Sequence, residues 1–196
     1  MADAGNSNTP MGLRPVGTLG SAGYAGRVQI FSTSTSDTAA IGIGDAVAMT
    51  GTADANGVAA VTRFTAAGTA SILGACVGIK PDPTDLTKTF RAASSATMIY
   101  VDTDPSTIYE IADSSTAQTT CLAATDVGVN ILLAPGTVDT TTGNSKTVLG
   151  TTVGTTTTMD CKVLGLSPKV GNAIGDYAKY QVIINRHVFS GFTAGQ

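Results

Sequence analysis

Residues 72–112 read ILGACVGIKPDPTDLTKTFRAASSATMIYVDTDPSTIYEIA, and this stretch decides the fold class. Its apolar run at 72–79 ends at prolines and aspartates, which continue neither a β-ladder nor a helix. Two β-rich segments follow at 97–101 and 107–111, separated by the Asp-Pro turn of residues 102–106. The pattern therefore predicts three strands joined in sequence order as a β-meander.

Further strands are expected on both sides of this stretch. Apolar residues alternate with period two, and Gly, Asn and Ser/Thr clusters separate the alternating segments. The Asn56-Gly57 pair is the strongest short hairpin signal, because these residue types adopt the left-handed conformation that a two-residue hairpin loop needs. The additional strands are expected at residues 27–31, 45–50, 58–65, 129–133, 160–166 and 177–189.

The composition agrees with a β-protein that has many tight turns. Gly, Ala, Thr and Val are abundant, and only 13% of the 196 residues are charged. A chain of this length buries roughly two thirds of its unfolded surface, so its core needs no disulfide. We predict an all-β fold, a β-barrel or jelly-roll-like sandwich, over residues 27–196. Within it, residues 137–158 are rich in Thr and Gly and are expected to form an exposed β-excursion.

Residues 1–26 show neither strand nor helix periodicity and are rich in Gly, Ser and Asn. We interpret them as an extended N-terminal arm. A plain linker would lack the apolar and cationic side chains that this arm carries, so we expect it to dock on a partner subunit. The expected contact residues are Met11, Leu13, Arg14, Pro15 and Val16.

The charge distribution argues against nucleic acid and membrane partners. The net charge is −3, and no run of basic residues exists that could neutralise phosphates. No apolar run approaches the roughly 20 residues that cross a bilayer, and the N-terminus does not have the pattern of a secretory signal. We therefore expect synthesis as a soluble protein in a cytoplasm.

The residues provide no constellation for catalysis. His187 is the single histidine, and its place in the last strand predicts a solvent-side or interface position. Neither a nucleophile elbow nor a phosphate-binding glycine loop is present. The acid pairs Asp82/Asp85 and Asp102/Asp104 lie in turns, where Asp accepts hydrogen bonds from backbone N–H groups. We predict that the protein is not an enzyme and has no catalytic or cofactor-binding residues.

A metal site is not expected either. Cys76, Cys121 and Cys161 are far apart and show no metal-binding spacing. They are interpreted as small apolar residues in or beside strands, with a disulfide or intersubunit bridge as the alternative. Asp54 and Asn56 resemble part of a calcium loop, but the third oxygen ligand and the distal Glu are missing.

Several short motifs run in order through nearly the whole chain: GLRPV at 12–16, ILG at 72–74 with Pro81, FRA at 90–92, IYV at 99–101, DP at 104–105, IYEI at 108–111, DVGVN at 126–130, TGNS at 142–145, KVLGL at 162–166, and 182–189 with Asn185 and His187. Together they resemble the small capsid decoration, or cement, proteins of tailed bacteriophages. The Thr-rich stretch 137–158 departs from that family, because it is longer and more repetitive.

The resemblance implies a structural virion protein that binds the outer capsid surface and stabilises it by bridging major capsid protein subunits. It also implies a symmetric homo-oligomer, with a trimer favoured over a dimer, made in the host bacterial cytoplasm. The main alternative is a phage fibre or surface adhesion module that binds carbohydrate, although such sites usually use exposed aromatic platforms and the chain has no Trp. A third hypothesis is an enzyme that uses Asp102, Asp104 and Glu110.

Overall fold

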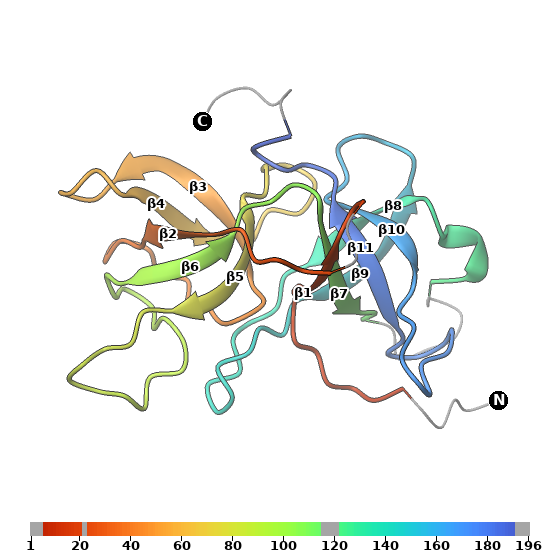
Figure 1. Ribbon diagram of the computed structural model, residues 1–196, viewed down its shortest axis with the longest axis horizontal. Coiled ribbons are helices and arrows are strands. Elements are labelled where there is room, and N and C mark those ends of the chain that lie inside the picture. The colour runs from red at the N-terminus through yellow and green to blue at the C-terminus, as the bar shows by residue number, and fades with distance from the viewer. Residues whose placement is uncertain (1–5, 21–22, 115–121, 191–196) are drawn as a thin grey trace.

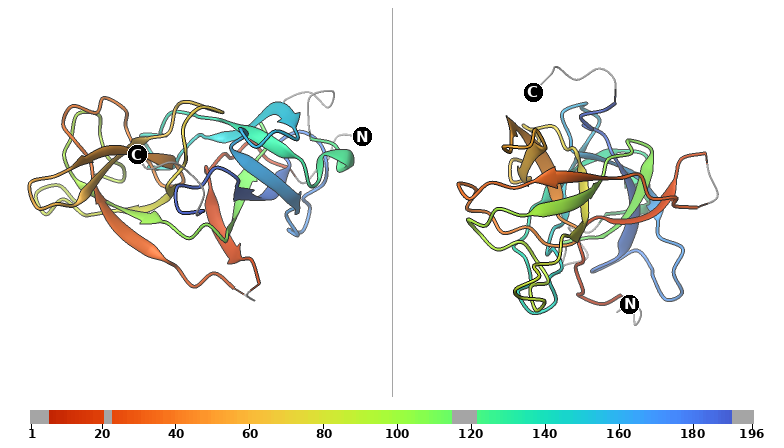
Figure 2. Two further views of the ribbon diagram at one scale, coloured as in Figure 1. Left: turned by 90° about the horizontal axis from the view of Figure 1, so that it is seen from above. Right: turned by 60° about the vertical axis from the view of Figure 1, so that its left-hand side comes forward.

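The computed structural model describes residues 6–20, 23–114 and 122–190. These residues form eleven strands and one turn of 3-10 helix, η1 (Ala124–Asp126), which confirms the predicted all-β class. The strands build two units, a closed barrel and a six-stranded antiparallel sheet, which lie side by side in Figure 1. Figure 2 shows the same arrangement from above, with the sheet's blue strands beyond one end of the barrel. None of the described helical segments is long and apolar enough to span a membrane.

Five strands close the barrel in the order β2-β4-β3-β5-β6. Their bounds are β2 (Val28–Ser32), β3 (Ala46–Ala53), β4 (Ala59–Arg63), β5 (Gly74–Ile79) and β6 (Met98–Asp102). Apolar side chains fill the interior, among them Phe31, Val47, Val61, Leu73, Ile99 and Val101. The β3–β4 hairpin turns at the predicted Asn-Gly pair, where one Asp54 oxygen accepts the N–H groups of Asn56 and Val58. The fragment that resembles a calcium loop is therefore a turn in this structure.

The sheet has the order β1-β7-β11-β10-β8-β9. Its strands are β1 (Arg14–Thr18), β7 (Thr107–Ala112), β8 (Asn130–Ala134), β9 (Val148–Gly154), β10 (Cys161–Leu166) and β11 (Lys179–Ile184). Alternate residues of β11 are buried as predicted, and they form one cluster with residues of the barrel strands. This shared core contains Ala46, Phe64, Ala75, Tyr109, Ile111, Val163, Tyr180, Val182 and Ile184. The two units are consequently packed against each other through a continuous apolar core.

Buried carboxylates add polar links inside this packing. Asp45, the residue just before β3, accepts a hydrogen bond from Thr147 Oγ1 at 3.3 Å. Asp160, just before β10, accepts the N–H groups of Gly68 and Leu133, both at 2.9 Å. Burial raises the pKa of both carboxyl groups, although these hydrogen bonds act in the opposite direction. Buried polar groups require such partners, so these contacts select one arrangement of the connecting loops.

The predicted meander is correct for its first two strands and wrong for the third. β5 pairs with β6, but β6 has β2 as its other neighbour, and β7 pairs with β1 and β11. Residues 102–106 therefore carry the chain from the barrel into the sheet. Barrel closure is the physical reason, because it occupies both edges of β6 and leaves no edge for β7.

The strand boundaries differ from the sequence prediction in two other places. Of the residues predicted as an arm, 14–18 form β1, which pairs with β7 and has a register shift between Pro15 and Gly17. The last strand ends at Ile184, and His187 instead forms a bridge with Ile72. Pro15 and Gly17 mask the alternation of β1, whereas the apolar pattern of the last strand continues past its hydrogen-bonded part.

Candidate interaction surface

The N-terminal segment, residues 6–13, is held against the rest of the chain at both of its ends. The Asn6 side chain donates to Ala173 O at 2.7 Å and accepts from Ala173 N at 3.2 Å. The N–H of Leu13 donates to Gly44 O at 2.8 Å. The segment thus runs from the β10–β11 connection of the sheet to the residues just before β3 of the barrel.

Four of the five residues predicted to contact a partner line one cavity, which we call the Met11 cavity. It has a volume of about 250 Å³. Met11 and Ile43 leave 39% and 40% of their surface exposed, so its rim is apolar. The full lining comprises Met11, Leu13, Arg14, Pro15, Tyr24, Ile43, Gly44, Cys76, Val77 and Asn144.

Arg14 supplies the cationic group at this cavity. Its side chain is exposed, and none of the ion pairs among the described residues includes it. A hydrated guanidinium beside an apolar rim can form a bidentate pair with a carboxylate when the surrounding apolar surface excludes water. The arrangement is therefore suited to an acidic group on a partner.

One of the predicted contact residues needs correction. The prediction places Leu13 on the contact surface, but the structure buries it completely, because its side chain belongs to the shared apolar core. Leu13 consequently lines only the floor of the cavity. Val16 is 38% exposed but does not line the cavity. Side chains of a regular strand alternate between its two faces. The register of β1 against β7 shifts between Pro15 and Gly17, so this alternation is interrupted at Val16.

Tyr24, Ile43 and Val77 are among the lining residues that the sequence reasoning missed. They come from the β1–β2 loop, the segment before β3, and β5. The sequence did contain one signal of close backbone packing at this place, because Ile43 lies between Gly42 and Gly44. A Cβ added to Gly44 would lie 2.1 Å from the carbonyl oxygen of Met11, so glycine permits the close approach that builds the cavity.

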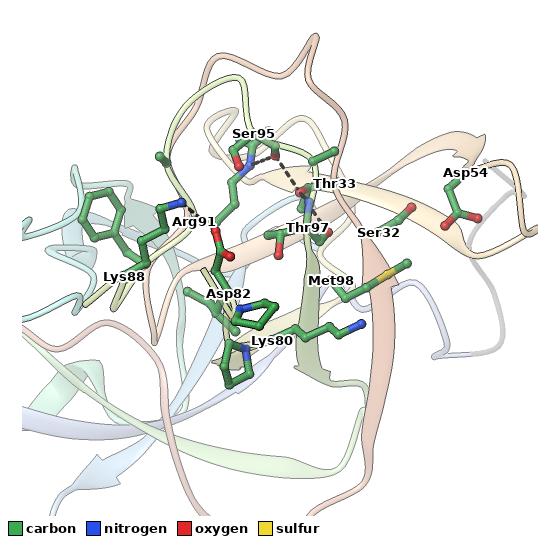
Figure 3. Close-up of a pocket in the computed structure, with 16 residues that line it drawn as sticks. Ser32, Thr33, Asp54, Lys80, Asp82, Lys88, Arg91, Ser95, Thr97 and Met98 are labelled. Atoms are coloured by element: carbon green, nitrogen blue, oxygen red, sulfur yellow. Dashed lines mark hydrogen bonds and ion pairs between the residues drawn. The ribbon is translucent and has the colours of Figure 1, made fainter. Parts of the chain in front are cut away.

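A larger cavity of about 460 Å³ lies at the barrel, between residues 80–98 and the strand β2 (Figure 3). Lys88 Nζ pairs with Asp82 Oδ2 at 2.7 Å at its rim. Asp82 and Asp85 also accept the backbone N–H groups of Thr84 and Thr87, as predicted for turn-forming aspartates. These carboxylates are engaged in the loop's own structure.

Arg91 is buried beneath this larger cavity and is fully engaged. Figure 3 shows its side chain reaching Ser95, where Nε donates to the carbonyl oxygen at 2.8 Å. The two Nη atoms donate to the carbonyl oxygens of Ser34, Asp37 and Ala39 and to the Asp37 carboxylate. The guanidinium thus connects the 34–39 loop to the 91–95 loop, and it has no free donor fork for a ligand.

The acids of the enzyme hypothesis are not brought into one accessible site. Asp102 is fully buried, and Asp104 and Glu110 each expose 6% of their surface. Glu110 faces the opposite way, towards Ser167 and Lys169, which both donate to it at 2.5 Å. Asp102 and Asp104 lie at the crossover between β6 and β7, whereas Glu110 lies within β7.

His187 is also misplaced by the sequence prediction. It is fully buried rather than solvent-side, and its Nδ1 accepts the N–H of Phe189 at 3.0 Å. Burial lowers the pKa of His187 to about 4, although the nearby Asp104 acts in the opposite direction. The imidazole is therefore neutral at pH 7. The backbone bridge to Ile72 pulls the chain end into the junction between the two units.

The cysteines for which a structure is described behave as predicted. Cys76 and Cys161 are free, fully buried and within strands β5 and β10. Burial raises the pKa of the Cys76 thiol to about 12 and raises that of Cys161 as well. Cys121 lies outside the described residues. Across the ranges 6–20, 23–114 and 122–190, no three His, Cys, Asp or Glu residues cluster as a metal site.

Comparisons with known proteins identify no relative. No protein-family model, no curated protein and no solved structure matches this chain. The contacts and exposed groups described above are consequently the structural basis on which a function can be proposed.

Proposed function

We propose that this chain is a structural virion protein that binds the outer surface of a tailed-phage capsid. It would stabilise the shell by bridging neighbouring major capsid protein subunits. The Met11 cavity is the observation that carries the proposal. Met11, Arg14 and Pro15 were selected from the sequence as contact residues, and they lie together at one apolar cavity, where Arg14 forms no ion pair with any described residue.

The fixed N-terminal segment supports this use of the cavity. Ordering a free arm on binding costs conformational entropy for every residue that becomes fixed. Here Asn6 and Leu13 already hold the segment in place, so Met11 and Arg14 are presented without most of that cost. The apolar rim would bury against a shell protein while Arg14 pairs with one of its carboxylates.

The way in which the acids are engaged supports a role without catalysis. Asp82, Asp85 and Glu110 each accept hydrogen bonds from neighbouring residues of the same chain. A general acid or base needs to reach a substrate proton, and these carboxylates instead hold loops together. A protein of this kind acts through contact area and through the number of contacts that it makes at once.

Multivalency would convert weak contacts into tight occupancy. A homo-oligomer, a trimer in our proposal, presents one Met11 cavity per subunit. After the first cavity binds, the others face their sites at high effective concentration, provided that the shell presents them at a matching spacing. Binding would then depend on the assembled capsid and be weak for an isolated shell protein.

The decisive experiment is cosedimentation with capsids of the source phage. The double variant Met11→Ser/Arg14→Glu removes the apolar rim residue and reverses the unpaired charge without touching the core. We expect it to fold and to lose at least tenfold in capsid affinity, about 1.4 kcal/mol per binding site. The matched control is Leu86→Ser/Lys80→Glu, because Leu86 is 78% exposed and both residues lie in the loop beside the larger cavity.

Three results would count against the proposal. Unchanged decoration by the Met11→Ser/Arg14→Glu protein would exclude the cavity as the contact surface. A monomeric wild-type protein in analytical ultracentrifugation would exclude the multivalent mechanism. Glycan binding without capsid association, abolished by substitutions at the larger cavity, would support the carbohydrate-binding alternative instead.

A further inference from the structure

The barrel leaves one edge of strand β2 largely uncovered. On one side, β6 pairs with β2 along its whole length, from Val28 to Ser32, without a shift in register. On the other side, β4 pairs with β2 only at Ser32, which lies opposite Ala60. Residues 28–31 therefore have no described strand on their outer side. We call this part of the strand the β2 edge.

The backbone groups of Val28 and Ile30 point towards this open side. Hydrogen-bonded and non-hydrogen-bonded pairs alternate along an antiparallel ladder. The N–H of Thr33 donates to Thr97 O at 2.9 Å, so every second residue before Thr33 also bonds to β6. The N–H and C=O groups of Val28 and Ile30 are consequently directed outward. Neither a strand pair nor a loop hydrogen bond of the described residues uses them.

The side chains of the β2 edge are exposed on both faces. Val28 and Ile30 lie on the outer face of the barrel and leave 42% and 54% of their surface exposed. Gln29 lies on the opposite face, together with the core residue Phe31, and yet it is also exposed. Solvent thus reaches this end of the strand from both faces, so the edge is accessible to a further strand.

The two edge strands of the six-stranded sheet are protected, in contrast to β2. β1 contains Pro15, which has no N–H, and its register shifts after that residue. β9 also has a register shift, and its Leu149 forms a bridge with Asp113. Prolines, bulges and covering segments are usual protections of a free edge. The sequence of β2, VQIFS, has no proline or charged residue, so its edge remains competent to pair.

We propose that the β2 edge pairs with the β2 edge of a second copy of this chain. The two strands run antiparallel about a two-fold axis at Gln29. In this register Val28 lies opposite Ile30 of the second copy, and each donates its N–H to the carbonyl oxygen of the other. The pairing joins the two barrels through one continuous sheet, which is the geometry of β-strand addition.

A second copy is the partner that fits because the β2 edge is complementary to itself. The same outward donors and acceptors meet in both halves of the contact, as a two-fold interface requires. Val28 and Ile30 lie on one face of the paired strands, where opposed aliphatic side chains stabilise a sheet. No like charges are opposed, because Arg27 lies opposite Phe31 and already pairs with Asp104 of its own chain.

This contact goes beyond the proposed capsid binding and does not depend on it. A two-fold axis relates two copies, so the contact is distinct from those within the proposed trimer and would link one trimer to a neighbouring one. No residue of β2 lines the Met11 cavity. Loss of capsid binding in the Met11→Ser/Arg14→Glu protein would thus leave the β2 contact intact, and the two proposals can fail separately.

A cysteine at the two-fold axis tests the register directly. Gln29 and its copy form a non-hydrogen-bonded pair, with Cα atoms about 4.5 Å apart, within the range of about 4.4–6.8 Å that a disulfide spans. We expect Gln29→Cys to form cross-linked dimers under mild oxidation much faster than Val170→Cys. Val170 is fully exposed in the β10–β11 connection, so its variant measures random collision. Wild type measures any cross-linking through the native cysteines.

Analytical ultracentrifugation tests the contact without a new cysteine. Ile30→Lys places an ammonium group among the aliphatic side chains of the contact, at a position that the monomer leaves exposed. We expect association through this edge to weaken at least tenfold, so that wild type reaches twice the mass of Ile30→Lys at the same concentration. Val170→Lys should associate like wild type, and circular dichroism checks that both variants are folded.

Two results would overturn the inference. One is a wild-type mass equal to that of folded Ile30→Lys from micromolar to millimolar concentration. The other is cross-linking of Gln29→Cys no faster than that of Val170→Cys, which would exclude this strand pairing even if the chain associates through another surface.

Discussion

The buried histidine predicts how the stability of this protein depends on pH. Burial lowers the pKa of His187 in the folded state to about 4, against the ordinary value of 6.5. The folded state therefore binds this proton less readily than the unfolded state does. The stabilisation is fully present above pH 6.5 and is lost as the pH falls towards 4.

The size of the effect follows from the two pKa values. Linkage gives a loss of about 2 kcal/mol in the free energy of unfolding at pH 5 and about 3 kcal/mol at pH 4, relative to pH 7. This is a large share of the roughly 5–15 kcal/mol that stabilises a typical domain. The contribution of His187 alone should thus remove a substantial part of that stability on acidification.

A variant isolates the contribution of His187 from those of the acids. Burial raises the pKa of Asp45, Asp102 and Asp160, so their protonation favours the folded state at low pH and opposes the histidine term. His187→Gln retains an acceptor for the N–H of Phe189 but cannot be protonated. The contributions of the acids cancel to first order when the unfolding free energy of the variant is subtracted from that of wild type.

The measurement is denaturant unfolding followed by circular dichroism at several pH values from 7 to 4. We expect wild type to lose about 3 kcal/mol more than His187→Gln over this range. If the difference in unfolding free energy between the two proteins stays constant with pH, His187 is not buried as a neutral imidazole, and the packing described at the junction is incorrect.

Two further predictions concern the backbone and a buried cation. Gly12 has a positive φ, and Gly12→Ala would place a Cβ 2.2 Å from Gly44 O, so the free energy of unfolding should fall by about 2–4 kcal/mol. Gly20 has a similar φ but no atom within 4 Å of its added Cβ, so Gly20→Ala should lower the free energy of unfolding by only about 1 kcal/mol. Urea unfolding of both proteins measures the difference, and equal costs would mean that the N-terminal segment is not docked at Gly44. Arg91→Met should destabilise by about 3–5 kcal/mol by the same assay, because it removes the fully buried guanidinium that donates to the partly buried Asp37 carboxylate and to several carbonyl groups. Arg186→Met, whose guanidinium bonds are solvent-exposed, should cost less than about 1 kcal/mol, and similar losses for both would contradict a clamping role for Arg91.

The strands themselves could be predicted because their signals are local. Alternating apolar residues at 28–32, 98–102 and 179–184 need only the period of two that a half-buried strand imposes. The hairpin at Asn56-Gly57 likewise depends on local preferences, because Gly57 adopts a positive φ and the Asp54 side chain accepts the N–H groups of Asn56 and Val58. The same holds for the aspartates of the turns, which bond to N–H groups two residues further along.

The candidate interaction surface was predictable only in part. Met11, Arg14 and Pro15 stand out locally, as apolar and cationic residues within a stretch rich in glycine and serine. Their neighbours Ile43 and Val77 lie far away in the chain and reach the cavity only when the barrel closes. Leu13 was assigned to the surface because nothing adjacent to it in the sequence shows that its side chain packs into the shared apolar core.

By itself, the sequence determined the strands, the turns and the absence of recognisable catalytic motifs, since each of these depends on residue type and short-range spacing. The tertiary structure decided which strand edges were available for pairing and which side chains became buried. Closing the barrel occupied both edges of β6 and sent β7 into a second sheet. That same crossover buried Asp102 and His187. Pairing and burial are properties of the whole packed chain, so the pattern of residues 72–112 predicted the three strands correctly but gave the third the wrong partner.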